Sequence, residues 1–375
     1  MRIAAELKLP RQLRNSLYYG LLLKDAGWSG NAVNKQQRKE VMAMRCERGG
    51  TLARLMGLPE ETAASIAANA ERWNGHGNPC GLAGDDIPIT SRIILAAQTL
   101  DLFYSCFGRE PALRVVVENS SFWFDPAVVK AVQSLEKRAK LWAGFERGDL
   151  LQNVLRLEPN PRMLSDGDVT LDAICQAFAT IVDAKSPFTC SHSNGVANAA
   201  VVMARRLGLE NSQILFVRHA ALLHDIGKMA VPNAILQKPG PLDAAEWKTI
   251  HSHPVHTWRI LSSIRGFEKM SEVAGSHHER LNGSGYFRGL TADQIQIETR
   301  VLMVADVFDA LLTNRPYRPA LPIEKVFEKL KNSSPQEFDP ACVRALEQSG
   351  IERDQSFKDI YTLREQLANT AARSR

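Results

Sequence analysis

The chain has 375 residues, of which 45% are hydrophobic and 23% are charged. That length is enough for about two domains with substantial cores, and the composition excludes disordered and collagen-like proteins. The six cysteines are scattered and include no C-x-x-C pair. This spacing favours buried thiols in a reducing compartment over a disulfide framework.

The formal net charge is +5, and no block of lysines and arginines indicates an arm that binds DNA or RNA duplexes. The first residues, MRIAAELKLPRQLRN, lack the apolar segment of a secretory signal. No run approaches the roughly 18 apolar residues of a membrane-spanning helix. We therefore expect a cytoplasmic protein with no membrane partner, and the mild positive charge permits an anionic substrate.

Apolar residues recur at helical spacings of three and four along most of the chain. The one strand-like run is LRVVVEN near residue 115, and RLEPNPRMLSDGD, at about 156–168, is typical of a linker. Beyond it, Gly208 and Gly227 mark helix ends, and Asp243 with Glu246 predicts a capping box. The sequence therefore predicts an all-α fold.

Two segments of the chain match each other without gaps. ERWNGHGNPCGLAGDDIPITSRIILAAQTLD, from Glu71, aligns with ERLNGSGYFRGLTADQIQIETRVLMVADVFD, from Glu279, at an offset of 208. Upstream, LLKDAG aligns with LLHDIG, and an FDP motif follows in both halves. We predict a tandem duplication of one helical bundle, with a degenerate domain at 1–155, a linker at 156–168 and a second domain at 169–375.

Histidines are concentrated in the second copy, where eight of the nine lie between His192 and His278. Three features there suit a metal centre: His224-Asp225, His277-His278, and Asp306 within an apolar helix. A carboxylate is costly to bury unless it is paired or ligates a cation. Histidines with carboxylates suit ions such as Mn, Fe, Ni and Zn.

The first copy lacks these residues as a set. In place of His224, His253, His277, His278 and Asp306 it has Lys24, Arg45, Asn69, Ala70 and Gln98. Scaffold residues, including Gly75, Gly77 and Arg92, match their counterparts. Because Lys24 and Arg45 would repel a divalent cation, we interpret the first copy as metal-free.

The second half resembles an HD-GYP domain, the metal-dependent phosphodiesterase branch of the HD superfamily. The matching text runs in order from about 180 to 345: SPFTCSHSNGVA, LLHDIGKMAVPNAIL, QKPGPLDAAEWKTIHSHP, HHERLNGSGYFRGL, ADVFDALLTNRPYRPAL and EFDP. The resemblance implies a helical bundle around a two- or three-metal centre, with cyclic di-GMP as the typical substrate. By motif it implies the metal ligands His192, His224, Asp225, His253, His277, His278 and Asp306. Asp225 would bridge the ions.

Three positions depart from the family pattern. Phe287 replaces the proline that rigidifies the loop after Tyr286, and Gly195 stands where an arginine is usual. Phe188 occupies the position of a glutamate found in members with three metals. We therefore expect two divalent ions, with Mn, Fe and Ni all admissible.

Four side chains are candidates for substrate binding. Lys228 follows Asp225 by three residues and can place a positive charge on a phosphate oxygen. Arg315 and Arg318 offer planar guanidinium groups to a phosphate or a guanine edge; a surface ion pair is the alternative for both. Tyr286 can stack or hydrogen-bond with the ligand. We assign catalysis to Asp225 and Lys228.

These observations predict a metal-dependent phosphodiesterase that hydrolyses cyclic di-GMP or 3',3'-cyclic GMP-AMP to the linear dinucleotide. One alternative is a regulatory module that binds a cyclic dinucleotide or a partner without turnover, and another is a phosphohydrolase for mononucleotides. The degenerate first half favours the module, whereas the complete ligand set of the second half opposes it. We also expect the first copy to pack on the catalytic half as an intramolecular pseudo-dimer.

Overall fold

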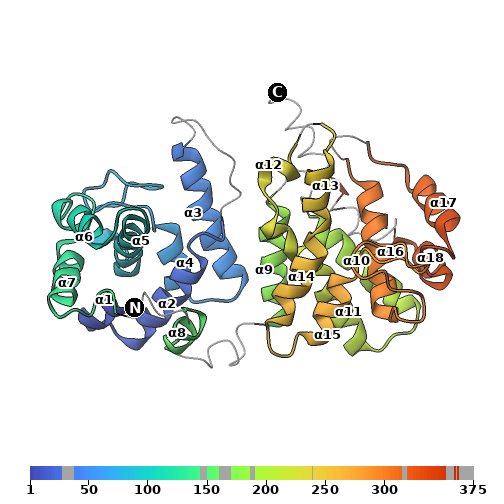
Figure 1. Cartoon of the computed structure of the whole chain (residues 1–375), viewed down its shortest axis with the longest axis horizontal. Helices are drawn as coiled ribbons and strands as arrows, with labels where there is room; N and C mark the ends of the chain where they lie inside the picture. The colour runs from blue at the N-terminus through green and yellow to red at the C-terminus, as the bar shows by residue number, and fades with distance from the viewer. Residues whose placement is uncertain are drawn as a thin grey trace. The chain divides into compact units, whose positions relative to one another are not determined.

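The computed structural model describes residues 1–27, 38–143, 150–159, 170–185, 191–238, 240–314, 319–351, 359 and 361–362. Within these ranges the regular structure is helical, and β pairing is confined to isolated bridges. The all-α prediction is therefore confirmed (Figure 1). The chain divides into two compact units, and the boundary between Ile174 and Cys175 falls in the first turn of the helix Leu171–Asp183, most of which belongs to the second unit.

The first unit is a helical bundle. Its helices are α1 (Arg2–Glu6), α2 (Arg11–Leu23), α3 (Arg38–Leu55), α4 (Glu60–Ala67), η1 (Gly84–Asp86), α5 (Ile89–Phe107), α6 (Arg109–Glu118), α7 (Pro126–Lys137) and α8 (Leu150–Arg156). Leu17, Ile93, Ile94, Phe124 and Val128 are almost completely buried in its core. The bundle therefore keeps a full apolar core of its own.

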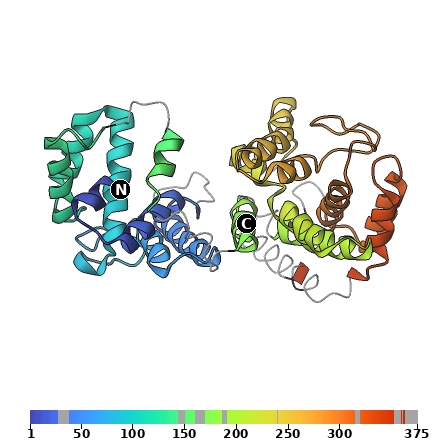
Figure 2. The same cartoon turned by 90° about the horizontal axis from the view of Figure 1, so that it is seen from below.

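The second unit is a larger bundle, seen from a second direction in Figure 2. Its helices are α9 (Leu171–Asp183), α10 (His192–Arg206), α11 (Asn211–Leu223), η2 (Ile226–Ala230), α12 (Asn233–Leu236), α13 (Ala244–His251), α14 (His253–Ser262), α15 (Glu268–Gly275), α16 (Ile297–Leu312), α17 (Ile323–Ser333) and α18 (Pro340–Glu347). Helix α10 packs against α11, α16 and α18. Its buried alanines, including Ala197 and Ala200, let these helices approach closely.

The strand-like interpretation of LRVVVEN is wrong, because this run lies in α6 and continues into Asn119. Ala112 and Val116 are fully buried and four residues apart, so they form one apolar face of the helix. Packing of this face outweighs the strand preference of three consecutive valines.

In both units an arginine and an aspartate at matching positions of the internal repeat join two helices. Arg92 Nη1 donates to Asp125 Oδ2 at 2.9 Å, and Arg300 Nη1 donates to Asp339 Oδ2 at 2.8 Å. Each aspartate also caps the helix that follows it, α7 or α18, through the backbone amide two residues on. An ion pair between an arginine on one helix and the aspartate that caps another is thus common to both bundles.

The predicted capping box and one of the two predicted helix ends are confirmed. Asp243 and Glu246 form the expected capping box of α13, and Gly208 lies just beyond α10 with a positive φ of 75°. Gly227 is not a helix end, since it lies within η2. A Cβ there would lie 2.0 Å from the carbonyl oxygen of His253, so glycine allows η2 to pack directly on α14.

Among the described residues, no helix is both long and apolar enough to cross a membrane.

Candidate metal centre

The seven side chains predicted as metal ligands meet in the second unit. His192 begins α10, His224 and Asp225 join α11 to η2, His253 begins α14, His277 and His278 follow α15, and Asp306 lies in α16. All but His278 are at most 5% exposed. Separate helix ends therefore deliver most of the group, which explains why no single periodicity in the sequence reveals it.

Three of the histidines are oriented by the same kind of hydrogen bond to the backbone. Nδ1 of His224, His253 and His277 contacts the backbone carbonyl oxygen three residues earlier, at 2.6, 2.7 and 2.6 Å. A carbonyl oxygen only accepts a hydrogen bond, so Nδ1 carries the proton and Nε2 of the neutral ring keeps a lone pair. Imidazoles that ligate metals are commonly oriented in this way.

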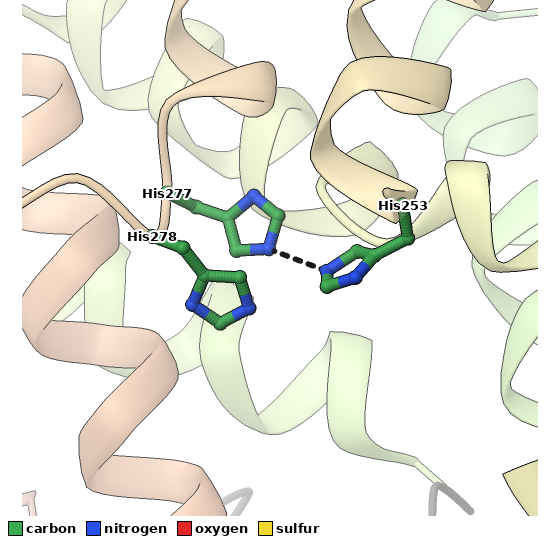
Figure 3. A group of neighbouring side chains, drawn as sticks. All are labelled: His253, His277 and His278. Atoms are coloured by element: carbon green, nitrogen blue, oxygen red, sulfur yellow. Dashed lines mark hydrogen bonds between the residues drawn. The ribbon is translucent and has the colours of Figure 1, made fainter. Parts of the chain in front are cut away.

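The Nε2 atoms of His253 and His277 lie 3.1 Å apart (Figure 3). With the proton of each neutral ring on Nδ1, this contact brings two lone pairs together unless a proton or a cation lies between them. Nε2 of His224 is buried without a hydrogen-bond partner. A cation bound here would accept the lone pairs of these Nε2 atoms, including that of His224. The three histidines therefore fit the expected metal ions.

Asp225 faces two different groups of histidines. Its Oδ2 lies 3.7 Å from His192 Nε2 and 3.4 Å from His224 Nε2. Its Oδ1 lies 3.3 Å from His253 Nε2 and 3.9 Å from His277 Nε2. One carboxylate therefore has an oxygen directed to each side of the centre, which is the arrangement of a bridging ligand.

Asp306 also contacts both sides. Its Oδ1 lies 3.3 Å from His192 Nε2 and 3.8 Å from His224 Nε2, and its Oδ2 lies 3.7 Å from His278 Nδ1. Three groups of atoms are close enough to hold an ion: His192, His224 and Asp306; His224, Asp225 and His277; His253, His277 and His278. Their overlap makes one extended centre rather than separate sites.

The protonation states of most of the group suit metal binding. Burial and the neighbouring imidazoles lower the pKa of His277 to about 3 and the pKa of His278 well below its usual value. Burial opposes ionisation of Asp225, but Lys228 and His224 outweigh it and hold its pKa well below the usual range. Metal ligands must be neutral imidazoles and ionised carboxylates.

His192 and His224 are the exceptions among the histidines. Burial lowers the pKa of His224, but the negative charge of Asp225 outweighs burial and raises the pKa above its usual value. For His192 the effect is larger. Burial lowers its pKa, but hydrogen bonds with Asp306 and Asp309 outweigh this and raise the pKa to about 9. A cation that binds Nε2 must therefore displace a proton. Asp309 was missed from the sequence, although it lies three residues after Asp306 on the same face of α16. No sequence signal indicates Tyr361, whose hydroxyl donates to Asp309 Oδ1 at 2.8 Å.

Lys228 lies beside the centre, where its ammonium group forms an ion pair with Asp225. The backbone around it is held by Lys185, which the sequence did not single out. Lys185 Nζ donates to the carbonyl oxygens of Lys228, Met229 and Val231 at 2.9, 3.1 and 2.9 Å. A buried lysine thus ties the end of α9 to η2 and fixes the position of Lys228.

Tyr286 contacts the centre with its ring. The ring stacks on His251 with centroids 4.2 Å apart, and its centroid lies 4.8 Å from that of the His278 ring. Two imidazoles therefore lie against the Tyr286 ring, and the residue is 38% exposed. Arg315, Arg318 and Phe188 lie outside the described residues, so their predicted roles stay predictions.

The first unit replaces this centre with fixed positive charge. Asp25 aligns with Asp225 and forms ion pairs with Lys24 and, at 2.5 Å, with Arg45, which aligns with His253. All three groups of described residues that could hold a metal lie in the second unit. An arginine that neutralises the retained aspartate is consistent with the metal-free interpretation of the first copy.

A helical bundle with histidines and aspartates converging from its helix ends defines a metal-dependent hydrolase of the His-Asp type. The family model described as "HD domain" matches residues 2–128 and 176–342. The chain therefore belongs to the HD domain family, and the resemblance found in the sequence is confirmed. The matched residues include most of both units.

Three comparisons with individual proteins agree with this assignment. The chain is 41% identical to 3'3'-cGAMP-specific phosphodiesterase 3 of Vibrio cholerae, over 93% of this chain and 88% of that protein. It is 35% identical to the cyclic di-GMP phosphodiesterase response regulator RpfG of Xanthomonas campestris, over 64% of each. The crystal structure of the V. cholerae cyclic GMP-AMP specific phosphodiesterase V-cGAP3 matches with a TM-score of 0.64 and 35% identity, over 93% of this chain and 90% of that one.

Proposed function

We propose that the second unit is a two-metal phosphodiesterase that hydrolyses a cyclic dinucleotide to its linear form. The observation that carries this proposal is the geometry of Asp225, whose two carboxylate oxygens face different pairs of histidines. A carboxylate placed between two groups of imidazoles is suited to hold two cations at once. His192, His224 and Asp306 would hold one ion, and His253, His277 and His278 the other.

When bound, two divalent ions supply a hydroxide nucleophile and neutralise charge on the attacked phosphoryl group. The protein's own residues bind and orient the substrate. Lys228 adds a positive charge next to Asp225, within reach of a non-bridging phosphate oxygen. The hydroxyl of Tyr286 can donate a hydrogen bond to the dinucleotide, and Arg315 and Arg318 would bind the second phosphate or a base.

The relatives narrow the substrate class. Phosphodiesterase 3 of V. cholerae is named for 3'3'-cGAMP and RpfG for cyclic di-GMP. The first of these aligns along nearly the whole of this chain, including its degenerate half. We therefore propose 3',3'-cyclic GMP-AMP as the first substrate to test, followed by cyclic di-GMP. Mn, Fe and Ni remain admissible metals; a cytoplasmic location and an intramolecular pseudo-dimer stay predictions.

The test combines metal analysis with product chromatography. The purified full-length chain is assayed with Mn, Fe or Ni against 3',3'-cyclic GMP-AMP, cyclic di-GMP and cyclic di-AMP. We expect about two ions per chain, and a linear dinucleotide as the first product. Removal of metal with a chelator should abolish turnover, and its return should restore it.

The same experiment separates the alternatives. A chain that holds metal and binds a cyclic dinucleotide without producing a linear product would be a regulatory module. Release of phosphate from mononucleotides, with no action on cyclic dinucleotides, would instead identify a mononucleotide phosphohydrolase. Either result would contradict the proposed activity.

A further inference from the structure

The loop that carries Tyr286 is attached to α14 and α15 by a cluster of four side chains. Phe287 and Arg288, which follow Tyr286 directly, pack against Trp258 of α14 and Glu272 of α15. We call Trp258, Glu272, Phe287 and Arg288 the loop anchor. It lies beside the metal centre and contains none of the residues predicted from the sequence to contact metal or substrate.

The contacts within the loop anchor are mutually supporting. The Arg288 guanidinium lies over the rings of Trp258 and Phe287, at 5.6 and 4.8 Å from their centroids. The same guanidinium forms an ion pair with Glu272, which also accepts a hydrogen bond from Trp258 Nε1 at 2.8 Å. Each member therefore contacts at least two others, and the cluster restrains both residues that follow Tyr286.

The internal repeat shows that the loop does not need the anchor merely to form. In the first unit Glu71 accepts hydrogen bonds from the amides of Cys80 and Gly81 at 2.6 and 3.1 Å. Its counterpart, Glu279, accepts hydrogen bonds from the amides of Arg288 and Leu290 at 2.7 and 2.9 Å. Both copies therefore fold this loop around a buried glutamate.

The anchor itself occurs in the second copy alone. At the shared offset of 208, the first copy has Gly50, Ala64, Pro79 and Cys80 in place of Trp258, Glu272, Phe287 and Arg288. The contact between α14 and α15 also differs from the contact between the equivalent helices of the first unit, α3 and α4. A Cβ on Gly275 would lie 2.9 Å from Trp258 Cβ, whereas the first copy pairs Gly50 with Ala67. The four anchor residues are thus absent from the copy that lacks the metal ligands.

From this pattern we infer that the loop anchor positions Tyr286 for substrate binding. The inference rests on the proposed function, since Tyr286 must contact a substrate. Helix α14 makes the coupling direct: it begins with His253 and bears Thr257, whose hydroxyl donates to the His224 carbonyl at 2.8 Å. Trp258 is the next residue, so the loop is held by a helix that is itself fixed to the centre.

The test uses the full-length, metal-loaded protein with two variants. Arg288→Ala removes the ion pair and both cation–π contacts, and Trp258→Phe keeps a ring but removes the donor to Glu272. We expect KM for the cyclic dinucleotide to rise about 3- to 10-fold while kcat changes less than about twofold. Metal content should be unchanged. Arg288→Lys keeps the charge without the planar group, so its KM should lie between those of the wild type and Arg288→Ala.

Hydrogen exchange supplies a readout that does not depend on turnover. Backbone amides of residues 281–290 should exchange about tenfold faster in Arg288→Ala, while α16 keeps its protection. Arg54→Ala, which breaks the exposed Arg54–Glu60 pair of the first unit, is the matched control and should alter neither KM nor this exchange.

Two results would overturn the inference. Unchanged KM together with unchanged exchange of 281–290, in both Arg288→Ala and Trp258→Phe, would show that the anchor does not position Tyr286. If the wild-type protein neither binds nor hydrolyses any cyclic dinucleotide, the proposed function fails and the substrate role of the anchor fails with it. Faster exchange in Arg288→Ala would then still support the anchoring itself.

Discussion

Nδ1 of His192 lies 2.6 Å from Oδ2 of Asp309. A carboxylate in this position holds the ring with Nε2 directed to the centre and makes the imidazole a stronger ligand. The hydroxyl of Tyr361 donates to the other oxygen of Asp309 at 2.8 Å. A residue near the end of the chain is thereby connected, through two hydrogen bonds, to a side chain of the metal centre.

Replacement of Asp309 should therefore weaken metal binding without removing a ligand. We expect Asp309→Asn to lower metal affinity by about 10- to 100-fold, measured by competition with a chelator. Tyr361→Phe removes one hydrogen bond to the same carboxylate and should have a smaller effect in the same direction. Wild-type affinity in both variants would show that Asp309 does not support the metal site.

Asp225→Ala should have a larger and different effect. Because both oxygens of Asp225 face histidine groups, its loss should lower the metal content below two ions per chain and reduce turnover at least about 10²-fold. Circular dichroism should remain helical. The matched control is Asp25→Ala in the first unit, which should leave metal content at its wild-type value. A variant Asp225→Ala with normal metal content and turnover would contradict the two-metal assignment.

The sequence indicated which side chains would meet in the second unit better than it indicated their arrangement there. Adjacent pairs such as His277-His278, and the loss of candidates from one copy, pointed to a common site. The orientation of the rings could not be predicted, because it depends on carbonyl groups at the ends of helices, as for His277 and Ala274. The contact of Tyr361 with Asp309 could not be predicted either, because nothing in the local sequence of Tyr361 indicates it.

The sequence predicted the helices correctly where the apolar periodicity is strong. Its predictions were wrong where packing between elements decides the local structure. Val115, Val116 and Val117 favour a strand as single residues, yet they lie in α6 because the bundle buries one face of that helix. Gly227 resembled a helix end, but it is a point of close approach between η2 and α14. Both errors concern contacts between elements distant in the sequence.

Arg315 and Arg318 should act in substrate binding. We expect alanine at either position to raise KM for the cyclic dinucleotide with metal content unchanged. Loss of one charge-assisted contact is worth roughly 1.5–3 kcal/mol, about 10- to 150-fold in KM. The measurement is steady-state kinetics with each cyclic dinucleotide, alongside metal analysis. Wild-type kinetics with every substrate would identify the two arginines as members of surface ion pairs.

The Arg300–Asp339 pair should make the stability of the second unit depend on pH. Burial raises the pKa of Asp339, but hydrogen bonds from Arg300 and from the Ala341 amide outweigh it and hold the pKa below its usual value. A carboxyl group with a depressed pKa in the folded state contributes stability above its unfolded pKa, near 4. That contribution is lost as the pH falls through the lower, folded-state pKa.

We therefore expect Asp339→Asn to be less stable than the wild type at pH 7, with the difference shrinking as the pH falls below about 4. Urea unfolding followed by circular dichroism at several pH values measures both free energies. Asp101→Asn, at an exposed position of α5, is the control and should leave the pH profile unchanged. A difference between Asp339→Asn and wild type that stayed constant from pH 7 to pH 3 would show that the charge of Asp339 does not stabilise the fold, and that its role is limited to capping α18.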